Sequence, residues 1–294
     1  MTKSRRVIRP FQIDDGSAFR LKDHDPAATL HLKSKKRAEE MLARGIARLS
    51  ALQEKLWAQD RWALLVIFQA MDAAGKDGAI KHVMSGVNPQ GCEVFSFQQP
   101  SSEELDHDFL WRSACRLPER GRIGIFNRSY YEEVLVVRVH KELLEKERIP
   151  KHLVTKDVWK ERFEDINAFE RYLTRNGIVI LKFFLNLSRQ EQKKRFLERL
   201  EMPAKSWKFS MSDASERQRW DEYMAAYEDL IRHTATRYAP WQVVPADHKW
   251  FTRLVVAEVI VDALEKLNLE FPKVDSAQRK ELQAARTVLE AEAD

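Results

Sequence analysis

The chain has 294 residues, of which 44% are hydrophobic and 32% charged, so it can bury a sizeable core and is not disordered as a whole. The longest apolar runs, such as residues 63–68 and 254–257, are too short to span a bilayer, which excludes a transmembrane protein. Fifty lysines and arginines against 45 acidic residues give a net charge of +5, which suggests an anionic partner without deciding its kind.

The first 33 residues carry several turn formers and are expected to be irregular. Apolar side chains at three- and four-residue steps then predict an amphipathic helix over Ser34–Ala58. The continuous apolar run Trp62–Phe68 is typical of a strand that is buried on both faces of a parallel sheet.

Strands and helices are expected to alternate over the rest of the chain. Further strands are predicted at Val94–Phe97, Arg122–Phe126, Ile178–Leu185 and Trp241–Pro245. Helices are predicted at Ser102–Cys115, Thr155–Asn176, Arg189–Glu201, Glu216–Tyr238 and Thr252–Leu267, and Ser188 with Glu191 forms a capping box at the start of the third. This alternation predicts an α/β fold with a parallel sheet and helices on both faces. The charged, alanine-rich residues 272–294 are expected to form a peripheral helix or a frayed tail.

The segment Gln69–Gly78, which reads QAMDAAGKDG, follows the first long strand and leads into a helix. In that context it is close to a P-loop, in which backbone N–H groups and a lysine, here Lys76, bind phosphate oxygens. Alanine replaces the usual first glycine, and Asp77 stands where a serine or threonine usually binds Mg²⁺. Asp72 is therefore the candidate metal ligand. The alternative is an ordinary tight turn with a surface lysine.

A second candidate segment, Asn127–Glu133 with the sequence NRSYYEE, ends another predicted strand. Ligands collect at the carboxyl ends of strands in open α/β sheets, so this segment is placed to meet an acceptor. The guanidinium of Arg128 can bind phosphate at two points, and Asn127 offers a neutral oxygen to a metal. The two tyrosines could instead pack at the sheet edge.

A third segment is rich in cations and contains aromatic residues. It comprises Arg195, Arg199, Lys205, Trp207, Lys208, Phe209 and Arg217. Such a stretch can bind single-stranded nucleic acid, close over phosphates as a mobile lid, or form a solvated helix face. The break at Met202 and Pro203 favours a loop with a function. Histidines show no metal-ligand spacing and no Gly-x-Ser-x-Gly motif is present, so a metal-dependent hydrolase and a serine hydrolase have no support.

Taken together, four segments resemble the polyphosphate kinase 2 family. They are Gln69–Gly78, Ile125–Arg138, Trp207–Phe209 and Ala239–Ala246, in the family's order, and the similarity covers about residues 20–272. The resemblance implies a P-loop kinase-like α/β fold at 60–272 with a helical lid at about 199–217. Residues 1–59 would form an N-terminal extension with an amphipathic helix, and 273–294 a charged tail. The Asn-Arg-Ser form with the following Tyr-Glu-Glu resembles the class III branch, which phosphorylates both nucleoside monophosphates and diphosphates.

The resemblance also implies roles for individual residues. The catalytic residues would be Asp72, Lys76 and Arg128, with Asp72 and Asn127 as ligands of Mg²⁺ or of Mn²⁺ in its place. Nucleotide and phosphate contacts would come from Ala73, Gly75, Asp77, Gly78, Asn127, Glu132 and Arg138. The lid cations that bind polyphosphate would be Arg199, Lys205, Lys208 and Arg217. Met202 departs from the family, whose members tend to carry Asn or Asp before the proline, and this difference concerns the lid hinge.

The resulting hypothesis is a reversible polyphosphate:nucleotide phosphotransferase that acts on AMP or ADP, with GMP and GDP as further candidate acceptors. We expect a cytoplasmic homo-oligomer, a dimer or a tetramer, with no membrane or nucleic-acid partner. Two alternatives stay open. One is an ATP-dependent nucleoside monophosphate kinase, because a P-loop does not select its donor. The other is a non-catalytic protein that binds single-stranded nucleic acid through the basic and aromatic stretch.

Overall fold

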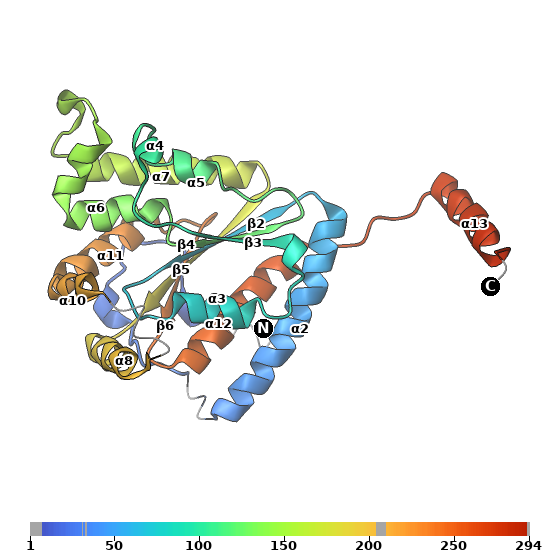
Figure 1. Cartoon of the computed structure of the whole chain (residues 1–294), viewed down its shortest axis with the longest axis horizontal. Coiled ribbons are helices and arrows are strands. Elements are labelled where there is room, and N and C mark those ends of the chain that lie inside the picture. The colour runs from blue at the N-terminus through green and yellow to red at the C-terminus, as the bar shows by residue number, and fades with distance from the viewer. Residues whose placement is uncertain (1–7, 31, 33, 204–209, 293–294) are drawn as a thin grey trace.

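A six-stranded sheet with the order β1-β6-β5-β2-β4-β3 forms the centre of the molecule (Figure 1). The computed structural model describes residues 8–30, 32, 34–203 and 210–292. The strands are β1 Gln12–Ile13, β2 Ala63–Gln69, β3 Cys92–Ser96, β4 Ile123–Asn127, β5 Ile178–Asn186 and β6 Trp241–Pro245. All neighbours pair in parallel except β1, which runs antiparallel to β6. The predicted α/β fold is therefore confirmed.

The helices connect these strands in chain order. They are α2 Lys35–Gln59, α3 Lys76–Val83, α4 Ser102–Leu105, α5 Trp111–Ala114, α6 Val136–Val139, α7 Val158–Arg175, α8 Arg189–Glu201, α10 Met211–Gln218, α11 Trp220–Thr234, α12 Lys249–Glu265 and α13 Ser276–Glu290. Short 3₁₀ helices are η1 Arg9–Phe11, η2 Leu21–Asp23, η3 Pro89–Gly91, η4 Tyr130–Val134, η5 Lys141–Glu147 and η6 Lys151–Leu153. Among the described residues no helix is both long and apolar enough to cross a membrane.

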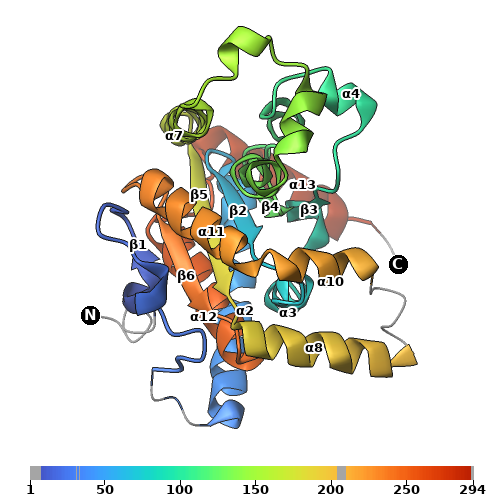
Figure 2. The same cartoon turned by 90° about the vertical axis from the view of Figure 1, so that its left-hand side faces the viewer.

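Helices cover both faces of the sheet, as Figures 1 and 2 show. On one face α2, α3 and α12 pack against Leu64, Val66 and Phe68 of β2. On the other face η4, α7 and α11 pack against Leu65 and Ile67 of the same strand. Every residue of β2 is buried, because alternate side chains enter two separate apolar layers. This arrangement explains the unbroken apolar run in the sequence.

Two helices, α8 and α10, lie side by side beyond the carboxyl end of the sheet (Figure 2). The expected lid, about residues 199–217, includes the end of α8 and most of α10. An ion pair between Arg199 of α8 and Asp213 of α10 joins the two helices at 3.6 Å. The C-terminal α13 stands away from the body after an extended connection (Figure 1), and its Leu282, Val288 and Leu289 are exposed. The tail thus contains a peripheral helix.

The predicted extents of two helices are wrong. The stretch Ser102–Cys115 forms the two short helices α4 and α5 instead of one helix, because Asp108 accepts a hydrogen bond from the N–H of Leu110 at 2.9 Å. Such local bonds compete with helical ones. The stretch Glu216–Tyr238 is divided at Arg219 into α10 and α11, and α11 ends at Thr234.

The N-terminal region contributes to the same core as the sheet. Residues Gln12 and Ile13 pair with β6, although this region was expected to be irregular. A strand of two residues is too short to show an alternating pattern, so the sequence could not predict it. Helix α2 packs against α12 and buries Leu49 and Leu56 completely.

Candidate active site

The loop between β2 and α3 has the backbone shape of a phosphate cradle. Gly75 precedes the first turn of α3 with φ +103°, a conformation that strongly favours glycine. Ala73 is also left-handed, with φ +63°. Because α3 begins at Lys76, the unpaired N–H groups of its first turn face the loop, and the positive end of the helix dipole favours an anion there.

The side chain of Lys76 folds back along this loop and is buried. Its Nζ donates a hydrogen bond of 2.7 Å to the carbonyl oxygen of Ala70. Burial lowers the pKa of Lys76, and the nearby carboxylate of Asp72 opposes that shift. The Lys76 side chain is thus held beneath the loop by the loop's own backbone, and its contact with substrate phosphates stays a prediction.

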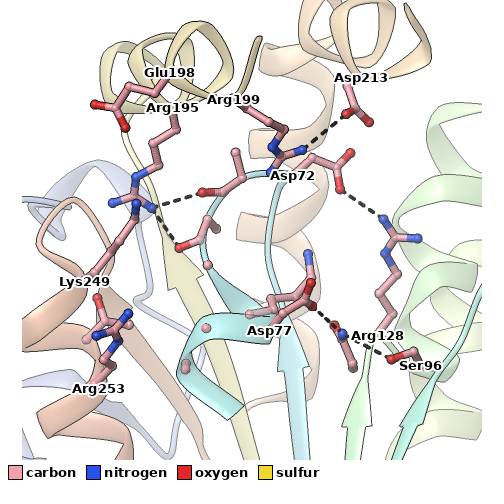
Figure 3. Close-up of a pocket in the computed structure, with 18 of the residues that line it drawn as sticks. Asp72, Asp77, Ser96, Arg128, Arg195, Glu198, Arg199, Asp213, Lys249 and Arg253 are labelled. Atoms are coloured by element: carbon pink, nitrogen blue, oxygen red, sulfur yellow. Dashed lines mark hydrogen bonds and ion pairs between the residues drawn. The ribbon is translucent and has the colours of Figure 1, made fainter. Parts of the chain in front are cut away.

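The segment after β4 lies beside the P-loop because β2 and β4 are parallel neighbours. Arg128 has φ +66° and donates from Nη2 to Oδ1 of Asp72 at 3.0 Å (Figure 3). Asn127 donates from Nδ2 to Oδ1 of Asp77 at 2.8 Å and to Oγ of Ser96 at 3.3 Å. Two side-chain contacts therefore join the two segments that the sequence singled out.

These segments line one cleft of about 1020 Å³, which α8, α10 and α12 border on the other side (Figure 3). Six cationic side chains face four acidic ones in its lining, so the cleft favours an anionic ligand. The cations are Lys76, Arg128, Arg195, Arg199, Lys249 and Arg253, and the acids are Asp72, Asp77, Glu198 and Asp213. The predicted residues Ala73, Gly75, Gly78 and Asn127 also line it.

Arg195 lines the cleft, but protein acceptors already take up most of its hydrogen-bond donors. Its guanidinium donates to the carbonyl oxygens of Ala73 at 3.1 Å and Ala74 at 2.9 Å, and also to those of Ala246 and Asp247. Its Nε donates to Glu191 at 2.9 Å. Arg195 therefore ties the P-loop to the end of β6 and to α8.

Three predicted residues do not line the cleft. Arg138 forms an ion pair with Asp229 at 2.6 Å and borders a separate cavity of about 280 Å³. Arg217 donates to Gln192 Oε1 at 2.7 Å and to the carbonyl oxygen of Arg189. The third residue is Glu132, whose pKa is raised by burial while Arg128 and Lys76 oppose the shift. The lid residues Lys205, Trp207, Lys208 and Phe209 fall outside the described residues.

The two tyrosines after Arg128 pack in the core. Tyr130 and Tyr131 are buried and their hydroxyls donate to Glu170 at 2.8 and 2.7 Å. Of the two interpretations that the sequence left open, packing is the one that the structure supports.

Sequence reasoning missed part of the cleft. Lys249 and Arg253 are one helical turn apart on α12, which begins just after the carboxyl end of β6. The rule that ligands gather at the carboxyl ends of strands applies to β6 as well, so Lys249 and Arg253 could have been predicted from the sequence. Ser96, Phe97 and Gln98 line the cleft from the end of β3, and this segment carries no recognisable motif.

The residues of the cleft fit a magnesium ion that substrate phosphates help to hold. The described residues contain no cluster of three or more His, Cys, Asp or Glu that could hold a metal alone. Mg²⁺ is usually bound through one or two carboxylates together with substrate phosphates and water. Asp72, Asp77 and the amide of Asn127 line the cleft and supply such a donor set.

A largely parallel sheet with a glycine- and lysine-containing strand-to-helix loop at the carboxyl end of β2 is an arrangement typical of phosphoryl-transfer proteins of the P-loop kinase-like class. Comparison with protein families finds a match to polyphosphate kinase 2 over residues 32–272. The chain belongs to the polyphosphate kinase 2 family, as its motifs suggested.

Individual relatives match over nearly the whole chain. An ADP-polyphosphate phosphotransferase of Rhodopseudomonas palustris is 50% identical over 96% of this chain and 98% of its own length. An AMP/ADP-polyphosphate phosphotransferase of Meiothermus ruber is 44% identical, over 93% and 98% of the two chains. The crystal structure of polyphosphate kinase 2 from Arthrobacter aurescens TC1 superposes with a TM-score of 0.84 at 41% identity, covering 93% of this chain and 95% of that one.

Proposed function

We propose that this protein is a polyphosphate-dependent nucleotide kinase. It transfers the terminal phosphoryl group of inorganic polyphosphate to a phosphate oxygen of AMP or ADP and so forms ADP or ATP. The reaction is reversible, because donor and product are both phosphoanhydrides. The observation that carries this proposal is the cationic cleft in which the P-loop faces Asn127 and Arg128.

The residues of the cleft act by position and charge. An acceptor phosphate is already nucleophilic, so the protein mainly has to hold the reacting groups in line and neutralise charge. The N-terminus of α3 and Lys76 bind phosphate oxygens on one side. Arg128 binds phosphate on the other side, where its fork can leave Asp72 for a phosphate oxygen.

Mg²⁺, with Mn²⁺ as a substitute, belongs to this proposal. When bound, the ion neutralises phosphate charge between donor and acceptor. Asp72 and Asn127 are the residues proposed to hold it, and Asp77, which accepts a hydrogen bond from Asn127, is a further candidate. Asn127 is the last residue of β4, Asp72 lies in the loop that follows β2, and Asp77 lies in the first turn of α3.

The acceptor range is proposed to include both AMP and ADP. The Meiothermus ruber relative carries both nucleotides in its name, and the Rhodopseudomonas palustris relative carries ADP alone. Glu132 is proposed to act near the acceptor, because it interacts electrostatically with Lys76 and Arg128. GMP and GDP are further candidates. The working form is proposed to be a cytoplasmic homo-oligomer, a dimer or a tetramer.

A donor exchange tests the proposal. The purified protein is given AMP or ADP together with either polyphosphate or ATP, and new nucleoside phosphates are measured by chromatography. Product formation that requires polyphosphate supports the proposal. Phosphorylation of AMP by ATP alone would instead make the protein an ATP-dependent nucleoside monophosphate kinase. An oligonucleotide titration in parallel detects nucleic-acid binding, and tight binding without turnover would contradict the proposal.

A further inference from the structure

The 3₁₀ helix η4 begins two residues after Arg128 and is attached to α7 at three of its first four side chains. The hydroxyls of Tyr130 and Tyr131 donate to Oε1 of Glu170 at 2.8 and 2.7 Å. Glu133 accepts a hydrogen bond from Nε of Arg162 at 2.8 Å. Glu132 is the exception among the four, because its carboxylate lies within electrostatic range of Lys76 and Arg128.

Glu170 is itself held by a buried lysine. Lys182, at the centre of β5, donates from Nζ to Oε2 of Glu170 at 2.7 Å, to the hydroxyl of Tyr131 at 3.0 Å and to the carbonyl oxygen of Thr234 at 2.8 Å. Lys182, Glu170 and Tyr131 have no exposed surface. All three protons of the ammonium group are thus used, and both oxygens of Glu170 accept hydrogen bonds.

The protonation of this cluster suits its geometry. Burial raises the pKa of Tyr130 and Tyr131 well above the ordinary tyrosine value, so both hydroxyls stay protonated and donate. A fully satisfied buried network permits one arrangement of its members, whereas an apolar core would permit several similar ones. Stability alone does not explain it, because apolar residues can replace a buried ion pair without loss.

The segment that the cluster fixes is strained next to the cleft. Arg128 has φ +66°, a left-handed conformation that a non-glycine residue keeps only when its surroundings impose it. The residues that follow supply that constraint, since Ser129 caps η4 through the N–H of Tyr131 at 3.2 Å and the tyrosines are attached to Glu170. The backbone that carries Arg128 thus continues directly into a segment that is attached to the core.

We propose that Glu170, held by Lys182, is a positioning residue for phosphoryl transfer, acting through Tyr130 and Tyr131 to orient Arg128 and Glu132 toward the acceptor. This inference rests on the proposed function. It assigns a role to a buried charged group that lies outside the cleft. It also predicts a loss that concerns the nucleotide more than the polyphosphate, since the tethered segment lies on the side of the cleft opposite α8.

The test uses Tyr131→Phe and Tyr130→Phe, because each variant removes one hydroxyl and keeps the ring packing. Glu170→Ala is unsuitable, since it would leave the charge of Lys182 buried without its partner and unfold the protein. The control is Glu164→Gln, which breaks an exposed ion pair with Lys160 on the same helix α7. Steady-state constants and the dissociation constant of ADP from calorimetry are measured at a temperature where all variants are folded.

Tyr131→Phe is expected to raise the nucleotide KM and the ADP dissociation constant together by about three- to tenfold, the effect of one lost hydrogen bond. The KM for polyphosphate is expected to stay within about twofold. Tyr130→Phe is expected to give a smaller change, because Tyr130 bonds to Glu170 and not to Lys182. The control is expected to match the wild type.

A lower melting temperature with unchanged nucleotide KM and ADP affinity would overturn the proposal and leave the cluster a structural role only. Equal losses for both substrates would overturn it as well. Failure of the proposed function is a different outcome, in which the wild type shows no polyphosphate-dependent turnover. Calorimetry with ADP needs no turnover, so the positioning proposal is still decided in that case.

Discussion

Arg128 and Asp72 form an ion pair across the mouth of the cleft, with 3.0 Å between Nη2 and Oδ1, and it joins the loops that follow β4 and β2. Their side chains are 39% and 32% exposed, so the pair adds little to folding stability. Both groups can therefore exchange this contact for substrate phosphate or a metal ion at small cost. Because the Arg128–Asp72 pair is weak in the free protein and lies in the cleft, we expect its loss to reduce turnover more than folding stability.

Asp72→Asn tests that expectation. Turnover should fall by about 100-fold or more, since a carboxylate that positions charge in the cleft is lost, while the free energy of unfolding should change by no more than about 1 kcal/mol. Rates are measured over a wide range of Mg²⁺ concentrations, together with thermal denaturation. Recovery of the wild-type rate at high Mg²⁺ would show that Asp72 only shapes the loop.

Glu132→Gln is expected to alter acceptor choice. Glu132 lies within electrostatic range of Lys76 and Arg128, so losing its charge changes the field at the acceptor phosphate. The ratio of AMP to ADP phosphorylation should change by about threefold or more. Glu145→Gln, on an exposed residue of η5, is the matched control. An unchanged ratio with a lower melting temperature would assign Glu132 to structure.

Glu147 predicts a dependence of stability on pH. Its Oε2 lies 3.4 Å from Nη2 of Arg162, and burial, with a smaller effect of Glu133, raises its pKa to about 8. The folded state thus keeps a proton that the unfolded state loses near pH 4.5. The stabilisation that this bound proton gives to the folded state is complete below about pH 4.5, and it is lost as the pH rises to about 8.

The variant Glu147→Gln imitates the protonated side chain, so it should be more stable than the wild type at pH 8.5 by about 1–3 kcal/mol, reduced for partial exposure. At pH 5 the two proteins should unfold at similar denaturant concentrations. Equal stability differences at both pH values would contradict the assigned titration.

The cations near the lid predict a salt-sensitive affinity for polyphosphate. Arg199 lines the cleft from α8, so Arg199→Gln should raise the KM for polyphosphate by about threefold or more and flatten its dependence on salt. Lys205→Ala and Lys208→Ala, outside the described residues, are expected to act in the same direction. Arg286→Gln on the distant α13 is the control (Figure 1). An equal rise in the polyphosphate KM for this control would show that the net charge of the protein, and not the position of Arg199, causes the effect.

The parallel sheet could be predicted because its strands are unbroken apolar runs. The rule that ligands gather at the carboxyl ends of parallel strands then predicted that Asp72 and Arg128 lie at one edge of the sheet. Contacts between distant segments could not be predicted. Lys182 meets the carbonyl oxygen of Thr234, 52 residues further along the chain, and nothing in either local pattern indicates that contact. Arg138 follows the second motif closely, yet it pairs with Asp229 away from the cleft.

The start of α8 shows the same limit at a smaller scale. Ser188 accepts a hydrogen bond from the N–H of Glu191 at 3.1 Å, as the predicted capping box requires. The reciprocal bond is missing from the box, because the carboxylate of Glu191 binds Arg195 and the N–H of Ser188 donates to Asp247 at 2.8 Å. The local motif predicted the bond to the Ser188 side chain correctly, whereas tertiary contacts prevent the reciprocal bond to Glu191.

Transfer of a phosphoryl group from polyphosphate to ADP is the central event of the proposed function, and ³¹P NMR of one sample can follow it. The protein is mixed with polyphosphate, ADP and Mg²⁺, and the signals of polyphosphate, ADP, ATP and free phosphate are integrated over time. Lys76→Met, which removes the buried cation beneath the P-loop, is the negative control and should slow transfer by about 100-fold or more. We expect one ATP for each phosphate unit lost from polyphosphate, with little free phosphate. Polyphosphate that disappears as free phosphate while ADP is unchanged would contradict the account.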